Sequence, residues 1–115
     1  MVLKYQRDSD RKWVEGLAAL AGAFSPIQII PGFVDELVAT VKPGSGGTAL
    51  LEFTTDNEDD IDSDPGSVDW IQWNIGAVSV NTAQTALGAV TAVRIQAFNQ
   101  PATCRLAGNR RTIRR

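Results

Sequence analysis

The sequence of 115 residues contains no histidine and only one cysteine, Cys104. Without histidine, the chain lacks the commonest general base and a leading ligand for transition metals. One cysteine cannot form an internal disulfide, which excludes a disulfide-stabilised scaffold and favours a reducing compartment. No apolar run approaches the roughly 18 residues of a membrane-spanning helix, so we expect no membrane partner. These shortages predict a protein that is not an enzyme and holds no cofactor.

Acidic residues are missing from the last part of the chain, and the charges are strongly segregated. Residues 1–34 carry a net charge of +1, residues 35–69 carry −9, and residues 70–115 carry +6 without one acidic residue. Separation of opposite charges favours association that is directed by charge, within the fold or between chains. We therefore predict protein partners, in a homo-oligomer or an assembly that holds many copies.

Apolar and polar residues alternate with a period of two along four segments, the pattern of antiparallel strands with one wet face. We expect two hairpins: residues 36–42 with 48–55, connected by residues 43–47, and residues 91–98 with 102–108. Short strands and turns rich in glycine and proline predict a mainly β fold, an antiparallel β-sandwich or a small barrel.

The same alternation predicts which side chains face the core. The inward residues are expected to be Leu37, Ala39, Val41, Ala49, Leu51, Phe53, Val93, Ile95, Ala97, Ala102, Cys104 and Leu106. Lys42, Arg94 and Arg105 stand at outward positions of their strands. An inward cysteine is a packing residue rather than a nucleophile, because a reactive thiolate needs an exposed electropositive site.

The region before these strands, residues 1–34, is predicted to be an N-terminal arm. Four apolar residues in it recur at helical spacing: Trp13, Leu17, Leu20 and Phe24. This spacing favours a short helix that ends before Pro26. The chain would then divide into the arm, a β domain at residues 35–108 and a basic tail at residues 109–115.

Seven of the thirteen acidic residues fall within residues 54–70. The alternating aspartates resemble a calcium loop, but Pro65 and Ile71 stand where that loop needs a glycine and a bidentate glutamate. Three interpretations stay open: an irregular calcium site, a solvated loop, and an acidic contact surface for arginines of a neighbouring chain. The carboxylates of the contact surface would be Asp56, Glu58, Asp59, Asp60, Asp62 and Asp64.

The chain ends in a basic tail whose arginines are Arg110, Arg111, Arg114 and Arg115. Arginine-rich ends bind nucleic acids or acidic protein surfaces. No aromatic residue is interleaved here to stack on bases, so we expect a protein partner rather than nucleic acid, with a solvated tail as the alternative.

Most of the binding energy must come from apolar residues, because each exposed ion pair contributes only about 0–1 kcal/mol. The candidates in the arm are Trp13, Phe24, Ile29, Ile30 and Phe33. Trp70 and Trp73 are three residues apart, which places them together on a helical turn but on opposite faces of a strand. Tryptophans serve more often as core or interface anchors than as platforms for sugar rings, and the sequence leaves both options open.

Four segments, in their order, resemble small β-rich virion proteins of tailed bacteriophages. They are ATVKPGSGGTALLEFTTDNEDDI, WIQWNIGAVSV, LGAVTAVRIQA and ATCRLAG. The resemblance implies a non-enzymatic structural protein of the virion, made in the host bacterial cytoplasm. Its role would be capsid decoration (cement), bound to the major capsid protein or other virion proteins, or that of a head–tail or tail accessory protein. The alternative of another class is a β module that binds calcium or carbohydrate.

Overall fold

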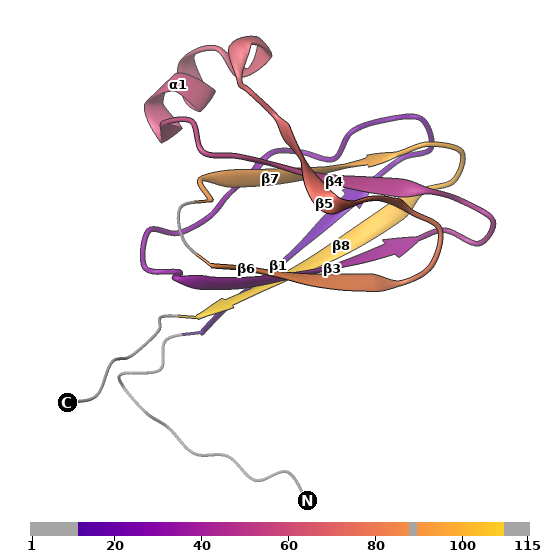
Figure 1. Ribbon diagram of the computed structural model, residues 1–115. Coiled ribbons are helices and arrows are strands. Elements are labelled where there is room, and N and C mark those ends of the chain that lie inside the picture. The colour runs from indigo at the N-terminus through magenta and orange to yellow at the C-terminus, as the bar shows by residue number, and fades with distance from the viewer. Residues whose placement is uncertain (1–11, 88–89, 110–115) are drawn as a thin grey trace, which may run out of the picture.

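The computed structural model describes residues 12–87 and 90–109, which form two four-stranded antiparallel sheets packed as a sandwich (Figure 1). Sheet A has the strand order β1 (Lys12–Ala19), β8 (Ala102–Asn109), β3 (Glu36–Pro43) and β6 (Thr82–Leu87). Sheet B has the order β2 (Gln28–Ile29), β7 (Ala92–Ala97), β4 (Ala49–Thr54) and β5 (Ile71–Val78). The predicted β-sandwich is confirmed. The alternative, a closed barrel, does not form, because each sheet keeps two edge strands.

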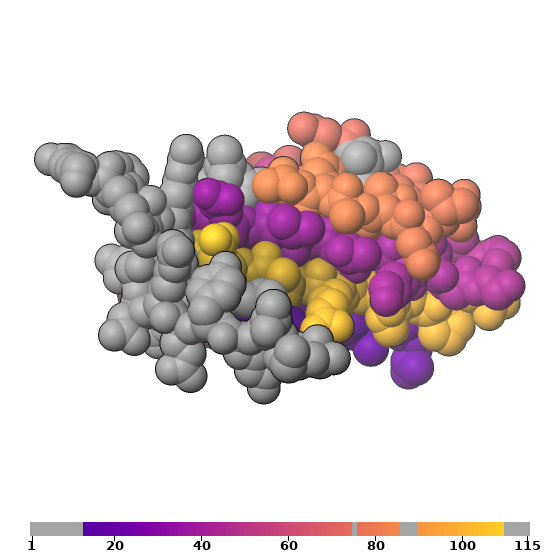
Figure 2. All heavy atoms as spheres, turned by 90° about the horizontal axis from the view of Figure 1, so that it is seen from below, coloured from indigo at the N-terminus to yellow at the C-terminus, as the bar shows by residue number. Residues whose placement is uncertain are grey.

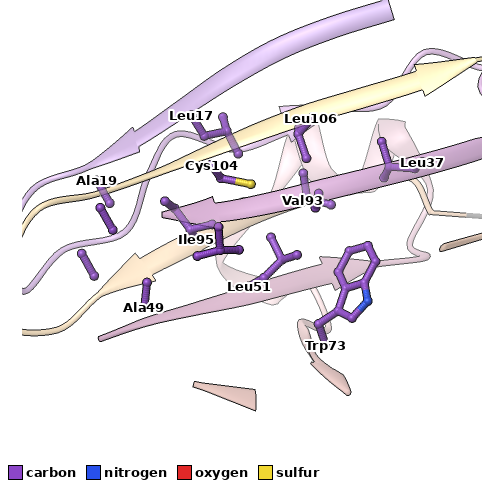
Figure 3. Close-up of a cluster of buried hydrophobic side chains, with 14 of the residues drawn as sticks. Leu17, Ala19, Leu37, Ala49, Leu51, Trp73, Val93, Ile95, Cys104 and Leu106 are labelled. Carbon is purple, nitrogen blue, oxygen red and sulfur yellow. The ribbon is translucent and has the colours of Figure 1, made fainter. Parts of the chain in front are cut away.

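The core lies between the two sheets and is built from the residues that the alternation placed inward (Figure 3). Eleven of the twelve predicted residues are at most 3% exposed: Leu37, Ala39, Val41, Ala49, Leu51, Val93, Ile95, Ala97, Ala102, Cys104 and Leu106. The twelfth, Phe53, is partly buried against the same cluster. Successive side chains of a strand point to opposite faces, so a period of two yields one buried and one outer face.

The two predicted hairpins are wrong, although their four strands are correct. Strand β3 pairs with β6 and β8 in sheet A, whereas β4 pairs with β5 and β7 in sheet B. Strands β7 and β8 are likewise in different sheets. Each short connection therefore crosses from one sheet to the other. Alternation reveals the inward face of a strand but not its partner, since a strand with an apolar face can pack in either sheet.

The two crossing connections, between β3 and β4 and between β7 and β8, pack against each other. The backbone N–H of Thr48 donates to Asn99 Oδ1 (3.1 Å), and Asn99 Nδ2 donates to the carbonyl oxygen of Gly46 (3.0 Å). A Cβ atom on Gly44 would lie 2.5 Å from the carbonyl oxygen of Pro101. Glycine is thus needed here for the close approach of two loops.

The short helix predicted between Trp13 and Phe24 is wrong. Strand β1 occupies Lys12–Ala19 and pairs with β8 along its whole length. Residues four apart share a face of a strand as well as of a helix, so the spacing that suggested a helix also fits a strand. Leu17, for example, is buried at 6% exposure in the core between the sheets.

The helix of the described residues lies instead in the acidic region. Helix α1 (Glu58–Ser63) and the single 3-10 turn η1 (Pro65–Ser67) connect β4 to β5 and lie outside sheet B (Figure 1). In the described part of the chain, no helix is long and apolar enough to cross a membrane. The division into arm, β domain and basic tail stays a prediction; strands β1 and β2, from the segment assigned to the arm, each belong to one of the sheets.

Candidate interaction surfaces

The outer face of sheet A, here called the sheet A face, consists of strand residues that point away from the core. Figure 2 shows β1, β8, β3 and β6 side by side on this side of the molecule. Its exposed residues are Val14, Gly16, Ala18, Val38, Lys42, Ala83, Thr85, Thr103, Arg105 and Asn109. Most of them are small, and the two cations have the longest side chains among them.

The two cations of the sheet A face are brought together by the pairing of β3 with β8. In this register Thr40 lies opposite Arg105 and Lys42 lies opposite Thr103. Both cations line an open depression of about 550 Å³ along β1 and β8. Neither forms an ion pair with a described residue. Among the described residues, the positive charges of Lys42 and Arg105 are therefore unpaired, although Glu15 lines the same depression and Glu36 stands on the same face of β3.

The acidic segment, residues 56–64, occupies the opposite side of the sandwich, outside sheet B (Figure 1). Three of its carboxylates stand in the first turn of α1, where the helix dipole favours negative charge. Ile61 is the buried residue of this helix, at 3% exposure, and it anchors the segment. The exposed carboxylates are those of Glu58, Asp59, Asp60, Asp62 and Asp64.

Asp56 differs from the other acidic residues that the sequence selected. Its Oδ2 accepts a hydrogen bond from the backbone N–H of Asp69 (2.9 Å), and its own N–H donates to Thr54 Oγ1 (3.1 Å). Asp56 thus joins the start of the segment to the residues before β5. In the described ranges, no three His, Cys, Asp or Glu side chains are placed to hold a metal ion. The irregular calcium site has no such ligand group there.

A second charged cluster lies on the outer face of sheet B, around Arg94. Its Nε donates to Glu52 Oε1 (2.9 Å), the residue opposite it in the register of β7 and β4. Its guanidinium carbon lies 4.0 Å from the centroid of the Phe24 ring and 4.3 Å from that of the Trp70 ring. Cation–π contacts of this kind contribute about 0.5–2 kcal/mol each. Arg94 therefore fixes two loop segments onto sheet B.

The sequence did not predict this cluster. The alternation predicts Arg94 on a wet face, which is correct for its strand, but its contacts depend on β7 lying beside β4. The predicted hairpin of β7 with β8 does not include that pairing. Glu52 and Arg94 are 42 residues apart in the chain, and no local pattern joins them.

The two tryptophans have different environments: Trp73 is on β5, and Trp70 lies just before that strand. Trp73 is 4% exposed and packs edge-to-face on Phe53, with ring centroids 5.3 Å apart. Trp70 is half-buried, and one face of its ring lies against Arg94. Its indole Nε1 is buried and has no hydrogen-bond partner among the described residues. Both tryptophans therefore serve as structural anchors.

The apolar residues selected from the arm are distributed over both sheets. Trp13 is on β1 and packs against the core, while Ile29 is on β2 in the other sheet. Ile30 is part of the core at 7% exposure, and Phe33 is half-buried. Phe24 is 47% exposed, with Arg94 over its ring. The four arginines of the tail lie outside the described residues.

Burial also decides the chemistry of Cys104, which is 1% exposed in the core. Desolvation raises the pKa of its thiol from 9.0 to about 12, so the thiolate is scarce at neutral pH. We expect a chromogenic disulfide reagent at about pH 8 to label this thiol no faster than the protein unfolds. Rapid labelling in denaturant is the control. Immediate reaction of one equivalent in native buffer would contradict the burial.

Comparison with known proteins adds one finding to this geometry. No protein-family model and no curated protein matches the sequence. Among solved structures, the SPBc2 prophage-derived protein YomS aligns with a TM-score of 0.60 over 95% of this chain and 98% of its own, at 12% identity. The chain shares its fold with YomS. A protein of Bacillus endospore appendages, which form disulfide-linked pili, aligns over 96% of this chain and 97% of its own, at 11% identity. Its TM-score of 0.46 is too low to support a conclusion.

Proposed function

We propose that this chain is a non-enzymatic structural protein of a tailed-phage virion, where it decorates the capsid by binding neighbouring capsid subunits. The observation that carries the proposal is the fold shared with YomS, a prophage-derived protein, over nearly the whole of both chains. A fold alone does not determine a function, so the proposal also needs a surface suited to the role. The sheet A face is that surface.

The size of the sheet A face suits binding in many copies. Strands about 4.8 Å apart with about 3.4 Å per residue give four strands of this length an area of about 500 Å². Stable interfaces bury about 800 Å² on each partner. One copy on one capsid subunit would thus bind weakly. Dense decoration requires that a copy contact several subunits, whose combined contacts raise the affinity.

The test is to locate the chain in virions of the phage that encodes it. Virions from cells that produce an epitope-tagged chain are purified on a density gradient, and the tag is located by immunogold electron microscopy. We expect gold over the whole head and many copies per particle by quantitative mass spectrometry. Gold particles found only at the neck or tail would show that the chain is a head–tail or tail accessory protein and not a decoration protein. Virions without the chain would overturn both roles.

A further inference from the structure

We propose that copies of this chain associate head to tail, with the acidic segment of one copy docked on the sheet A face of the next. The inference rests on the proposed function for its setting. It assigns the part of the sheet A face around Lys42 and Arg105 to a neighbouring copy, so that this copy and the capsid subunits share the face. The partner is a second copy of the chain, which presents the carboxylates of residues 56–64.

The positions of the two surfaces make such a contact repeatable. The acidic segment lies outside sheet B, and the sheet A face lies on the other side of the sandwich (Figures 1 and 2). One copy can therefore use both surfaces at once, with two different neighbours. Two unlike surfaces form a heterologous contact, which produces rings if the rotation closes and open chains if it does not.

The charges of the two surfaces are complementary and are not paired among the residues that the structure describes. The acidic segment has five exposed carboxylates, none of which forms an ion pair with a described residue. On the sheet A face, Arg105 and Lys42 likewise have no described acidic partner. Gly16 and Thr40, the residues opposite Arg105 in the neighbouring strands, are too small to hide its guanidinium.

Apolar contact can add to the charge pairing. Val14 and Val38 lie on either side of Ala107 in the row next to Arg105, and they are 41% and 36% exposed. Exposed ion pairs are individually weak and are screened by salt. We therefore expect an association that grows with protein concentration and is lost at high ionic strength, rather than a tight dimer.

The competing occupant of this side of the molecule is the edge of β1 from a second copy. The N–H of Gly16 bonds to Glu15 Oε1 (3.2 Å) instead of the ladder with β8, so alternate backbone groups of β1 face an open edge. Two β1 edges could pair to give a closed dimer. Against this, a charged residue on an edge strand discourages such pairing, and Glu15 supplies that charge.

Two neutralised variants of the full chain separate these models. The face variant carries Arg105→Gln and Lys42→Gln, and the segment variant carries Asp59→Asn, Asp60→Asn and Asp62→Asn. All five side chains are exposed, so both variants should melt within a few degrees of the wild type. Sedimentation velocity is measured up to about 1 mM protein. Salt is set at about 0.01 M and about 1 M, where the Debye lengths are about 30 Å and 3 Å.

We expect the wild-type chain to form growing oligomers at low salt only, and each variant alone to associate at least about tenfold more weakly. An equimolar mixture of the variants retains one complementary contact, between the segment of one and the face of the other. The mixture should therefore form a 1:1 dimer and nothing larger. Pairing of β1 edges, which both variants keep, would instead give dimers of each variant alone as readily as dimers in the mixture.

Three results would overturn the inference. The first is a mixture that stays monomeric, and the second is a wild-type chain that stays monomeric at low salt. The third is a closed dimer whose affinity is unchanged by Arg105→Gln. Stronger dimerisation of the Glu15→Gln variant would assign the dimer to the β1 edges. The proposed function is judged separately, by the presence of the chain in virions. Decoration by a chain that never self-associates would end the inference alone, and self-association without decoration would end the proposed function alone.

Discussion

Replacing Trp73 with alanine is expected to lower the free energy of unfolding by about 3–5 kcal/mol, the range for truncation of a buried aromatic residue. The Trp73 side chain is 4% exposed and lies in the core between the sheets, edge-to-face with Phe53. Its removal would leave a cavity that the framework of paired strands can close only in part. For a chain of this length, 1 kcal/mol corresponds to roughly 4 °C in the melting temperature.

Thermal and urea unfolding, followed by circular dichroism, measure this loss. The matched control is Val80→Ala, because Val80 is an apolar residue just beyond β5 that is 69% exposed. That control should change the stability by less than about 0.5 kcal/mol. Trp73→Phe should fall between the two, since it keeps an aromatic ring beside Phe53. Equal stability of Trp73→Ala and Val80→Ala would show that Trp73 does not support the core.

Replacing Arg94 with alanine is expected to lower the free energy of unfolding by about 2–3 kcal/mol. The substitution leaves the carboxylate of Glu52, which is 13% exposed, without its cation, and removes the guanidinium from between Phe24 and Trp70. Loss of one partner of a fully buried ion pair lowers the free energy of unfolding further. The Arg94 side chain is 20% exposed, so water can partly solvate the carboxylate of Glu52 that is left behind.

The shape of the guanidinium can be tested separately from its charge. Arg94→Lys keeps the positive charge but loses the planar group that stacks on the two rings, so it should recover only part of the stability. A double-mutant cycle of Arg94→Ala with Glu52→Ala isolates the ion pair, for which we expect a coupling of about 1 kcal/mol. Full recovery by lysine would show that stacking on Phe24 and Trp70 adds nothing.

The sequence by itself determined which face of β3, β7 and β8 enters the core, whereas β4 also buries Leu50 and Thr54 on its other face. Ile95 and Leu106 are fully buried at positions where the alternation placed them inward, and Arg105 points outward as expected. These outcomes could be predicted because the direction of a side chain in a strand depends only on its position along that strand. The exposure of the acidic segment can also be predicted from the local sequence, because carboxylates without cationic partners stay in water.

Only the tertiary structure decided which strands lie side by side. A spacing of four residues, from Trp13 to Leu17, fits a helix and a strand equally, and pairing with β8 selects the strand. The sequence placed Lys42 and Arg105 outward one at a time, but pairing of β3 with β8 puts them on one face, just as pairing of β4 with β7 joins Glu52 to Arg94. Such pairings depend on contacts between distant segments, and their free energy comes from the core that both sheets enclose together. A pattern confined to one strand does not contain that information.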